Sequence, residues 1–130
     1  INYSNKNYAE KKIELIVKKN KIELICLAGF MKILSRKFIK SFKGRILNIH
    51  PSLLPKYKGL NTHKRVIKNN EKFSGCTVHF VNEKLDSGKI VLQKKVKITK
   101  SDDELKLSKK ILKIEHKIYP LAIKKLFSIH

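Results

Sequence analysis

The chain has 130 residues, of which 42% are hydrophobic, and a formal net charge of +21. This length suits one domain with a modest core, and the apolar share with its regular hydrophobic runs excludes an intrinsically disordered chain. No apolar stretch approaches the roughly 20 residues that span a bilayer, which excludes a membrane-spanning helix.

The positive charge raises the question of nucleic acid, because 31 residues are basic and only 10 are acidic. However, the basic residues are nearly all lysines, and they are spread along the chain in pairs such as Lys11-Lys12 and Lys109-Lys110. A nucleic-acid module usually gathers arginines and aromatic residues into one patch. We therefore do not expect nucleic acid as a partner and predict a solvated surface that attracts anionic substrates.

Cys26 and Cys76 each lie inside a short apolar run, which is typical of reduced, buried thiols in a cytoplasmic protein. No group of cysteines and histidines has the spacing of a zinc site, so we expect no metal. We expect no signal peptide, because no charged region leads into an apolar one at the start of the sequence.

Hydrophobic spacing and turn residues predict an alternation of helices and strands. In chain order these are a helix over 8–20, a buried strand over 23–28, a helix over 35–42 capped by Ser35, a strand over 45–49, a loop over 51–60, a helix over 64–68 capped by Thr62, strands over 76–81 and 90–96, and a terminal helix that begins with the capping pair Ser101 and Glu104. Pro120 should kink or restart that last helix.

This order predicts an α/β fold. We expect an open, mainly parallel, Rossmann-like sheet with flanking helices and a late antiparallel strand pair. No linker divides the chain, so residues 1–130 are predicted to form a single domain.

Asn48 and His50 come at the end of a predicted buried strand, two residues apart, so their side chains project to the same face. Ligands of open α/β sheets bind beyond the carboxyl ends of the strands. Taken alone, such a polar pair is more often a structural hydrogen-bonding site than a catalytic one.

The surrounding sequence is more specific. Residues 48–57 read NIHPSLLPKY, and this block resembles the signature of the formyltransferases that use 10-formyltetrahydrofolate. Residues 59–63, GLNTH, resemble the phosphoribosylglycinamide formyltransferase branch in particular. Further blocks at 27–35, 78–88 and 115–120 follow in the order and spacing of the family, so the resemblance covers essentially the whole chain.

The resemblance implies a formyltransferase fold and the transfer of a formyl group from 10-formyltetrahydrofolate, as co-substrate, to the amine of 5'-phosphoribosylglycinamide in purine (IMP) synthesis. It implies that Asn48 stabilises the oxyanion, that His50 is the general acid or proton shuttle, and that Asp86 orients His50 and keeps it charged. His79 and His63 are interpreted as supporting residues. Asn61 stands where the family commonly has a histidine.

The resemblance also implies two sets of binding residues. For the folate they are Lys6, Met31, Lys32, Ile33, Leu34, Asn48, Asn82, Glu83, Lys84, Leu85 and Asp86. For the ribonucleotide they are Leu112, Lys113, Ile114 and Glu115. Glu115 also shares a helix face with apolar residues, where a carboxylate should be paired or functional. Leu112 departs from the family, in which that position is often polar.

Three other functions stay open at this stage. Methionyl-tRNA formyltransferases usually have Arg-Gly and then Ala-Ala-Pro after the leucine-leucine-proline. Formyltetrahydrofolate hydrolases usually have a phenylalanine within the serine-leucine-leucine block. This chain has neither pattern. A basic nucleic-acid-binding module is the alternative from another class.

The family's amino-terminal strand and glycine-rich phosphate loop have no counterpart here, and the chain begins with Ile1. We therefore expect that the sequence is the carboxyl-terminal two-thirds of the domain, and that roughly 60 residues, a pair of βα units, precede it. We expect a monomer or a weak homodimer.

Overall fold

The computed structural model describes residues 5–29 and 34–127 as four helices and four strands. In chain order they are α1 (Lys6–Lys19), β1 (Leu24–Leu27), α2 (Arg36–Ser41), β2 (Arg45–His50), α3 (Thr62–Lys68), β3 (Phe73–Phe80), β4 (Ile90–Lys97) and α4 (Glu104–Phe127). β1 was predicted as a buried strand, but none of its residues is buried, and Cys26, also predicted to be buried, is exposed. All the predicted elements are otherwise present, and all but one lie within two residues of the bounds predicted for them. β3 is the exception, because it begins at Phe73 rather than at residue 76.

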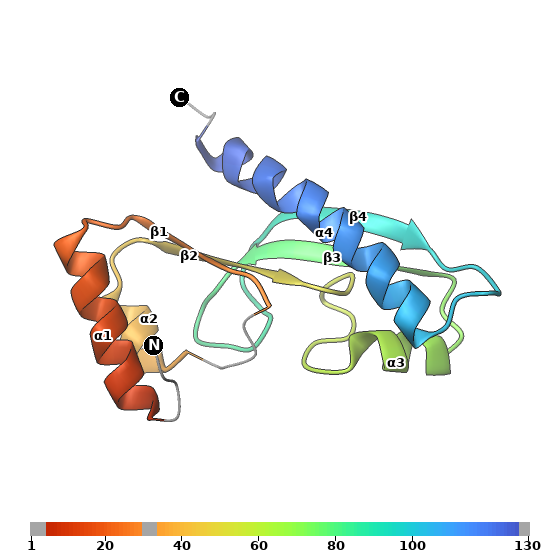
Figure 1. Ribbon diagram of the computed structural model, residues 1–130, viewed down its shortest axis with the longest axis horizontal. Coiled ribbons are helices and arrows are strands. Elements are labelled where there is room, and N and C mark those ends of the chain that lie inside the picture. The colour runs from red at the N-terminus through yellow and green to blue at the C-terminus, as the bar shows by residue number, and fades with distance from the viewer. Residues whose placement is uncertain (1–4, 30–33, 128–130) are drawn as a thin grey trace.

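The strands form one sheet in the order β1-β2-β3-β4 (Figure 1). β1 and β2 are parallel, whereas β2 with β3 and β3 with β4 are antiparallel. The α/β class, the early parallel part and the late antiparallel pair are confirmed. The described sheet is more antiparallel than expected, because α3 lies beyond the carboxyl end of β2 instead of crossing back along the sheet (Figure 1). The chain therefore enters β3 at that end and runs back beside β2.

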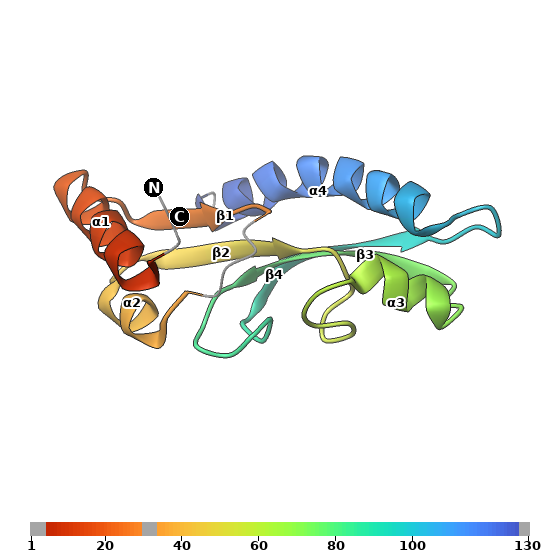
Figure 2. The ribbon, with the colours of Figure 1, turned by 60° about the horizontal axis from the view of Figure 1, so that its bottom comes forward.

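The main core lies between the sheet and α4, which covers one face of it (Figure 2). Alternate residues of the two central strands point toward α4, as the period of two in a strand requires. The buried members of this core on β2, β3 and α4 are Leu47, Ile49, Cys76, Val78, Leu107, Ile111, Ile118 and Ala122. The intervening residues, Asn48, His50, Thr77 and His79, therefore project from the opposite face of the sheet.

One predicted helix cap is confirmed and two are wrong. Ser35 caps α2 by accepting a hydrogen bond from Phe38 N. α3 begins after Asn61, which has a left-handed φ of 56° and makes no side-chain cap, while Thr62 is buried. At α4, Asp103 rather than Ser101 provides the cap, because its carboxylate accepts from Lys106 N at 2.7 Å. A carboxylate at this position directly precedes the first helical turn and also suits the helix dipole.

Pro120 does not restart the last helix, since α4 runs without interruption through 24 residues. Ile118 and Ala122, which flank the proline, are both buried against the sheet, and this packing holds the helix across the missing hydrogen bond. Among the described helices, α4 included, none combines the length and the hydrophobicity needed to cross a membrane.

Tyr119 connects α4 to the parallel strands. Its hydroxyl lies 2.7 Å from the carbonyl oxygen of Leu27 and 3.2 Å from that of Leu47. Tyr119→Phe is expected to lower the free energy of unfolding by about 1–2 kcal/mol, because buried carbonyl acceptors lose their donor. Urea denaturation measures the change. Tyr8→Phe is the matched control, since Tyr8 is exposed, and an equal loss in both variants would contradict the role of the Tyr119 hydroxyl.

Candidate active site

The face of the sheet opposite α4 carries a cluster of polar side chains at the end of β2. Asn48 and His50 project from β2, and the antiparallel register places Asn48 opposite His79 and His50 opposite Thr77 on β3. Side chains directly opposite each other in a sheet are neighbours, so these four polar groups, two of them imidazoles, meet at this point. His50 and His79 are both buried.

Asp86 completes the cluster from the loop between β3 and β4. Its Oδ2 lies 3.6 Å from His50 Nδ1, and its Oδ1 lies 3.9 Å from His79 Nε2. The side chains of His50, His79 and Asp86 are only 7%, 3% and 8% exposed. The structure thus brings together the amide, the imidazole and the carboxylate that the sequence places far apart, and the carboxylate lies between two imidazoles.

Backbone groups of the loop after β2 hold this arrangement. The N–H of Gly59 donates to Asp86 Oδ2 at 2.8 Å, and the carbonyl of Tyr57 lies 2.8 Å from His50 Nε2. Gly59 has a φ of 86°, which favours glycine at this position. Both nitrogens of His50 therefore face acceptors, Tyr57 O and the Asp86 carboxylate, an arrangement in which a protonated imidazole can donate on both sides.

The same loop is fastened to the sheet and to α3. The hydroxyl of Thr77 donates to Ser52 O at 2.7 Å, and it accepts from Leu54 N at 3.2 Å. Arg65 on α3 donates to the carbonyls of Leu60 at 3.0 Å and Lys58 at 2.6 Å. Because its backbone is tied on both sides, the loop positions its carbonyl and N–H groups before any ligand binds, as electrostatic catalysis requires.

His79 is the member of the cluster for which the resemblance implied only a supporting role. Its Nδ1 lies 3.0 Å from its neighbour's carbonyl, Phe80 O, and its Nε2 lies 3.4 Å from Asn48 Nδ2. Burial lowers the pKa of His79, while the Phe80 carbonyl and Asp86 act in the opposite direction. A neutral His79 donates from Nδ1 and accepts the Asn48 amide at Nε2, so it orients that amide. In β3, His79 follows the core residues Cys76 and Val78 with the period of two of a strand. This pattern indicates that His79 projects from the face of the sheet opposite the core.

His63, in the first turn of α3, lies near the cluster. Burial is the main reason that its pKa is lowered; Glu104 raises it, and nearby His50 lowers it further. Its Nδ1 is buried and has no partner among the described residues. Asn61 is exposed at the start of α3 and contributes no side-chain cap.

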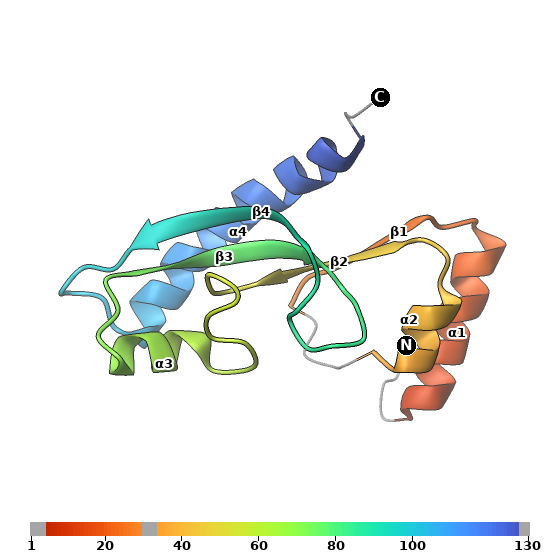
Figure 3. The same ribbon diagram turned by 180° about the vertical axis from the view of Figure 1, so that it is seen from behind.

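The predicted folate residues fall in three places. Met31, Lys32 and Ile33 lie outside the described residues, and Leu34 directs its side chain into a small core with Phe38 and Ile46. The loop before Asp86 is exposed, and it carries Asn82, Glu83, Lys84 and Leu85. Lys6 is exposed at the start of α1, which lies at the end of the sheet away from α3 (Figure 3). Of these residues, the exposed loop is the part that continues directly into the cluster.

The predicted ribonucleotide residues lie on α4, on the other side of the sheet from the cluster. Leu112 and Lys113 are exposed, and Ile114 packs against the main core. Burial raises the pKa of Glu115 to about 7, and no described residue forms an ion pair or hydrogen bond with its carboxylate. Glu115 is one helical turn before Tyr119, whose hydroxyl reaches the last residue of β1, so it lies near the same strand ends.

The raised pKa of Glu115 predicts a pH-dependent stability. Its carboxyl group binds a proton more tightly in the folded protein than in the unfolded chain, where the pKa is near 4.5. The folded state should therefore lose on the order of 2 kcal/mol as pH rises from about 4.5 to 7. Glu115→Gln is expected to remove this loss.

Urea denaturation of both proteins between pH 5 and 8 measures the effect. The stability of the variant relative to the parent should increase with pH. A constant difference across the range would contradict the assignment. Glu83→Gln, in an exposed carboxylate, serves as the control.

The fold and the cluster define an α/β protein with amide, imidazole and carboxylate side chains gathered at the end of a central strand. The chain belongs to the formyl transferase family, because the pattern of that family, described as "Formyl transferase", matches residues 1–123.

Individual relatives support the same assignment. The chain is 49% identical over 123 residues to a phosphoribosylglycinamide formyltransferase of Haemophilus influenzae, a match that covers 95% of this chain and 58% of the relative. It is 43% identical over 121 residues to the human trifunctional purine biosynthetic protein adenosine-3, covering 93% of this chain and 12% of that protein. The chain therefore spans less than two thirds of the length of these relatives.

Solved structures confirm the formyltransferase fold. The crystal structure of phosphoribosylglycinamide formyltransferase from Bacillus halodurans matches this chain with a TM-score of 0.89 at 37% identity. The match covers 98% of this chain and 66% of the chain in that structure. The corresponding structure from Brucella melitensis has a TM-score of 0.86 at 43% identity, covering 98% and 65%.

Proposed function

We propose that the protein transfers the formyl group of 10-formyltetrahydrofolate to the amine of 5'-phosphoribosylglycinamide, a step of purine synthesis. The observation that carries this proposal is the meeting of Asn48, His50 and Asp86 in one buried cluster, in a chain of the formyl transferase family. The names of the relatives, phosphoribosylglycinamide formyltransferase and trifunctional purine biosynthetic protein, support the choice of acceptor.

The chemistry requires a donor for a developing negative oxygen and a path for one proton. The substrate amine attacks the formyl carbon, and the carbonyl oxygen becomes an oxyanion. The amide of Asn48 has a second N–H besides the one that faces His79, and this N–H is the donor for that oxygen. When the carbon–nitrogen bond to the folate breaks, the nitrogen of the folate takes up a proton, and the attacking amine loses one. His50, held by Asp86 and Tyr57 O, is positioned to pass this proton.

The two binding regions follow from the resemblance. For the folate we propose residues 31–34 and the loop of Asn82, Glu83, Lys84 and Leu85, whose Leu85 side chain is 54% exposed and offers an apolar surface. We propose Lys6 for the anionic glutamate tail. For the amine of the ribonucleotide we propose Glu115, with Leu112, Lys113 and Ile114 beside it, because an unpartnered carboxylate can accept from the N–H groups of the amine that attacks.

Both proposed substrates are anions, and the net charge of +21 would favour their approach. We further propose that the protein is cytoplasmic, in line with two free cysteines, and that it acts as a monomer or weak homodimer.

A formyl-transfer assay with the full-length protein tests the proposal. Purified protein is mixed with 10-formyltetrahydrofolate and, in parallel, with 5'-phosphoribosylglycinamide, methionyl-tRNA or no acceptor. Loss of the formyl group only in the presence of the ribonucleotide is the expected result. Transfer to methionyl-tRNA, or hydrolysis without an acceptor, would instead identify one of the other enzymes of this family.

A further inference from the structure

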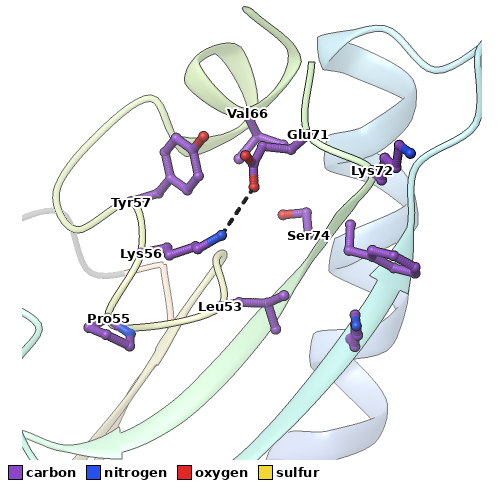
Figure 4. Close-up of a pocket in the computed structure, with 10 residues that line it drawn as sticks. Leu53, Pro55, Lys56, Tyr57, Val66, Glu71, Lys72 and Ser74 are labelled. Carbon is purple, nitrogen blue, oxygen red and sulfur yellow. Dashed lines mark ion pairs between the residues drawn. The ribbon is translucent and has the colours of Figure 1, made fainter. Parts of the chain in front are cut away.

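A pocket of about 340 Å³ lies behind the loop that holds the active site. It is bordered by residues of that loop, α3, β3 and β4, and it contains none of the four cluster residues Asn48, His50, His79 and Asp86. Its volume is near the lower end of the range for small-molecule sites. Figure 4 shows its lining, with Lys56 and Glu71 facing each other across it.

The walls of the pocket combine apolar surface with an unsatisfied polar group. Leu53 and Val66 supply aliphatic surface, and the rings of Tyr57 and Phe73 supply aromatic surface. The hydroxyl of Ser74 is buried and has no hydrogen-bond partner among the described residues. It points to the side of the pocket on which Lys56 and Glu71 lie (Figure 4). A buried hydroxyl without a partner costs free energy, and a bound polar group would remove that cost.

The charges of the pocket favour an anion that also has hydrogen-bond donors. Three lysines, Lys56, Lys72 and Lys95, line it, against a single carboxylate, Glu71. Lys56 Nζ lies 3.6 Å from Glu71 Oε2, and Lys95 Nζ lies 4.0 Å from the centre of the Phe73 ring. Lysine ammonium groups bind phosphate, whereas the carboxylate can accept from hydroxyl groups of a ligand.

We propose that this pocket binds a nucleoside monophosphate. Such a molecule has a flat apolar base for the aliphatic and aromatic walls, sugar hydroxyls for Glu71 and Ser74, and a phosphate for the lysines. The proposal of binding does not rest on the proposed formyl transfer, because no cluster residue lines the pocket.

The pocket also shares a wall with the active site. Lys56 and Tyr57 line the pocket, and the carbonyl of the same Tyr57 accepts from His50. Ser52, whose carbonyl is bound to Thr77, donates its hydroxyl to Lys56 O at 2.6 Å. A ligand that moves this wall therefore changes the environment of the His50 imidazole, and the pocket is a regulatory site for the cluster.

Titration of the full-length protein with AMP, followed by NMR, tests the proposal. Adenosine and inorganic phosphate, each of which carries one part of AMP, are titrated in parallel. AMP is expected to saturate, to shift the amide signal of Ser74 and the ring signals of His50, and to bind at least tenfold more tightly than either half, since each half lacks one set of contacts. Equal binding of AMP and adenosine would overturn the role of the lysines and with it the proposal.

Two sets of variants locate the site. Lys72→Gln with Lys95→Gln removes two exposed charges without touching the core and should weaken AMP binding about tenfold or more. Lys109→Gln with Lys117→Gln removes the same charge from the exposed side of α4 and should leave binding within twofold. Ser74→Val, which removes the buried hydroxyl, should weaken AMP binding while the protein stays folded. AMP affinity that is unchanged in the first double variant would place AMP elsewhere and overturn the proposal.

Discussion

Replacing His50 by alanine is expected to lower the turnover of formyl transfer about 1,000-fold in the full-length protein. The imidazole is held between Tyr57 O and Asp86, and no other side chain of the cluster can take its place in proton transfer. His79 is its nearest substitute, but burial lowers the pKa of His79, so it stays neutral and is engaged with Asn48 and Phe80 O. Turnover is measured at saturating concentrations of both substrates.

His116→Ala is the control, because His116 is an exposed histidine of α4. Its turnover should remain within twofold of that of the parent protein. Circular dichroism and thermal unfolding show whether the His50 variant is folded, since His50 is buried and its removal leaves a small cavity. A folded His50→Ala protein with turnover within tenfold of the parent would remove His50 from the mechanism.

The sequence predicted those parts of the fold in which one local signal dominates. β2 was predicted because Ile46, Leu47 and Ile49 form a short apolar run, and two of these residues are in the main core. α4 was predicted from apolar residues at helical spacing, among which Leu107 and Ile111 are fully buried. In both elements local periodicity and tertiary packing agree, so the pattern alone was sufficient.

The direction of β3 depended on the path of the chain through space. Residues 51–61 and α3 carry the chain past the end of β2, and the return beside β2 follows from that path. Local propensity does not encode such a path. The early start of β3 has a similar origin, because Ser74 and Gly75 are weak strand formers that pair with Val96 and Lys95 on β4.

The site shows the same division. The spacing of Asn48 and His50 placed their side chains on one face, and the resemblance added Asp86 from a distant loop. The central place of His79 required the register between β2 and β3, which sets it opposite Asn48. The backbone contacts of Tyr57 and Gly59 carry no side-chain signature, so sequence patterns alone do not reveal them.

Replacing Asp86 by asparagine is expected to lower turnover about 100-fold while the free energy of unfolding changes by less than about 1 kcal/mol. The substitution preserves the shape of the side chain and one oxygen that can accept from Gly59 N. Asp86 has a φ of 47°, a region that asparagine tolerates at least as well as aspartate, so the backbone should not be strained. The variant therefore removes chiefly the negative charge beside His50.

The loss should fall on turnover rather than on the affinity for the ribonucleotide, because the negative charge lies 3.6 Å from the imidazole that is proposed to pass the proton, in a buried site where Coulomb interactions are strong. Asp103→Asn is the matched control, since Asp103 is an exposed carboxylate that caps α4 and asparagine can also cap a helix. Equal turnover in Asp86→Asn and the parent would mean that the charge of Asp86 is not used. A large loss of stability with unchanged turnover would make Asp86 a structural anchor for Gly59 instead.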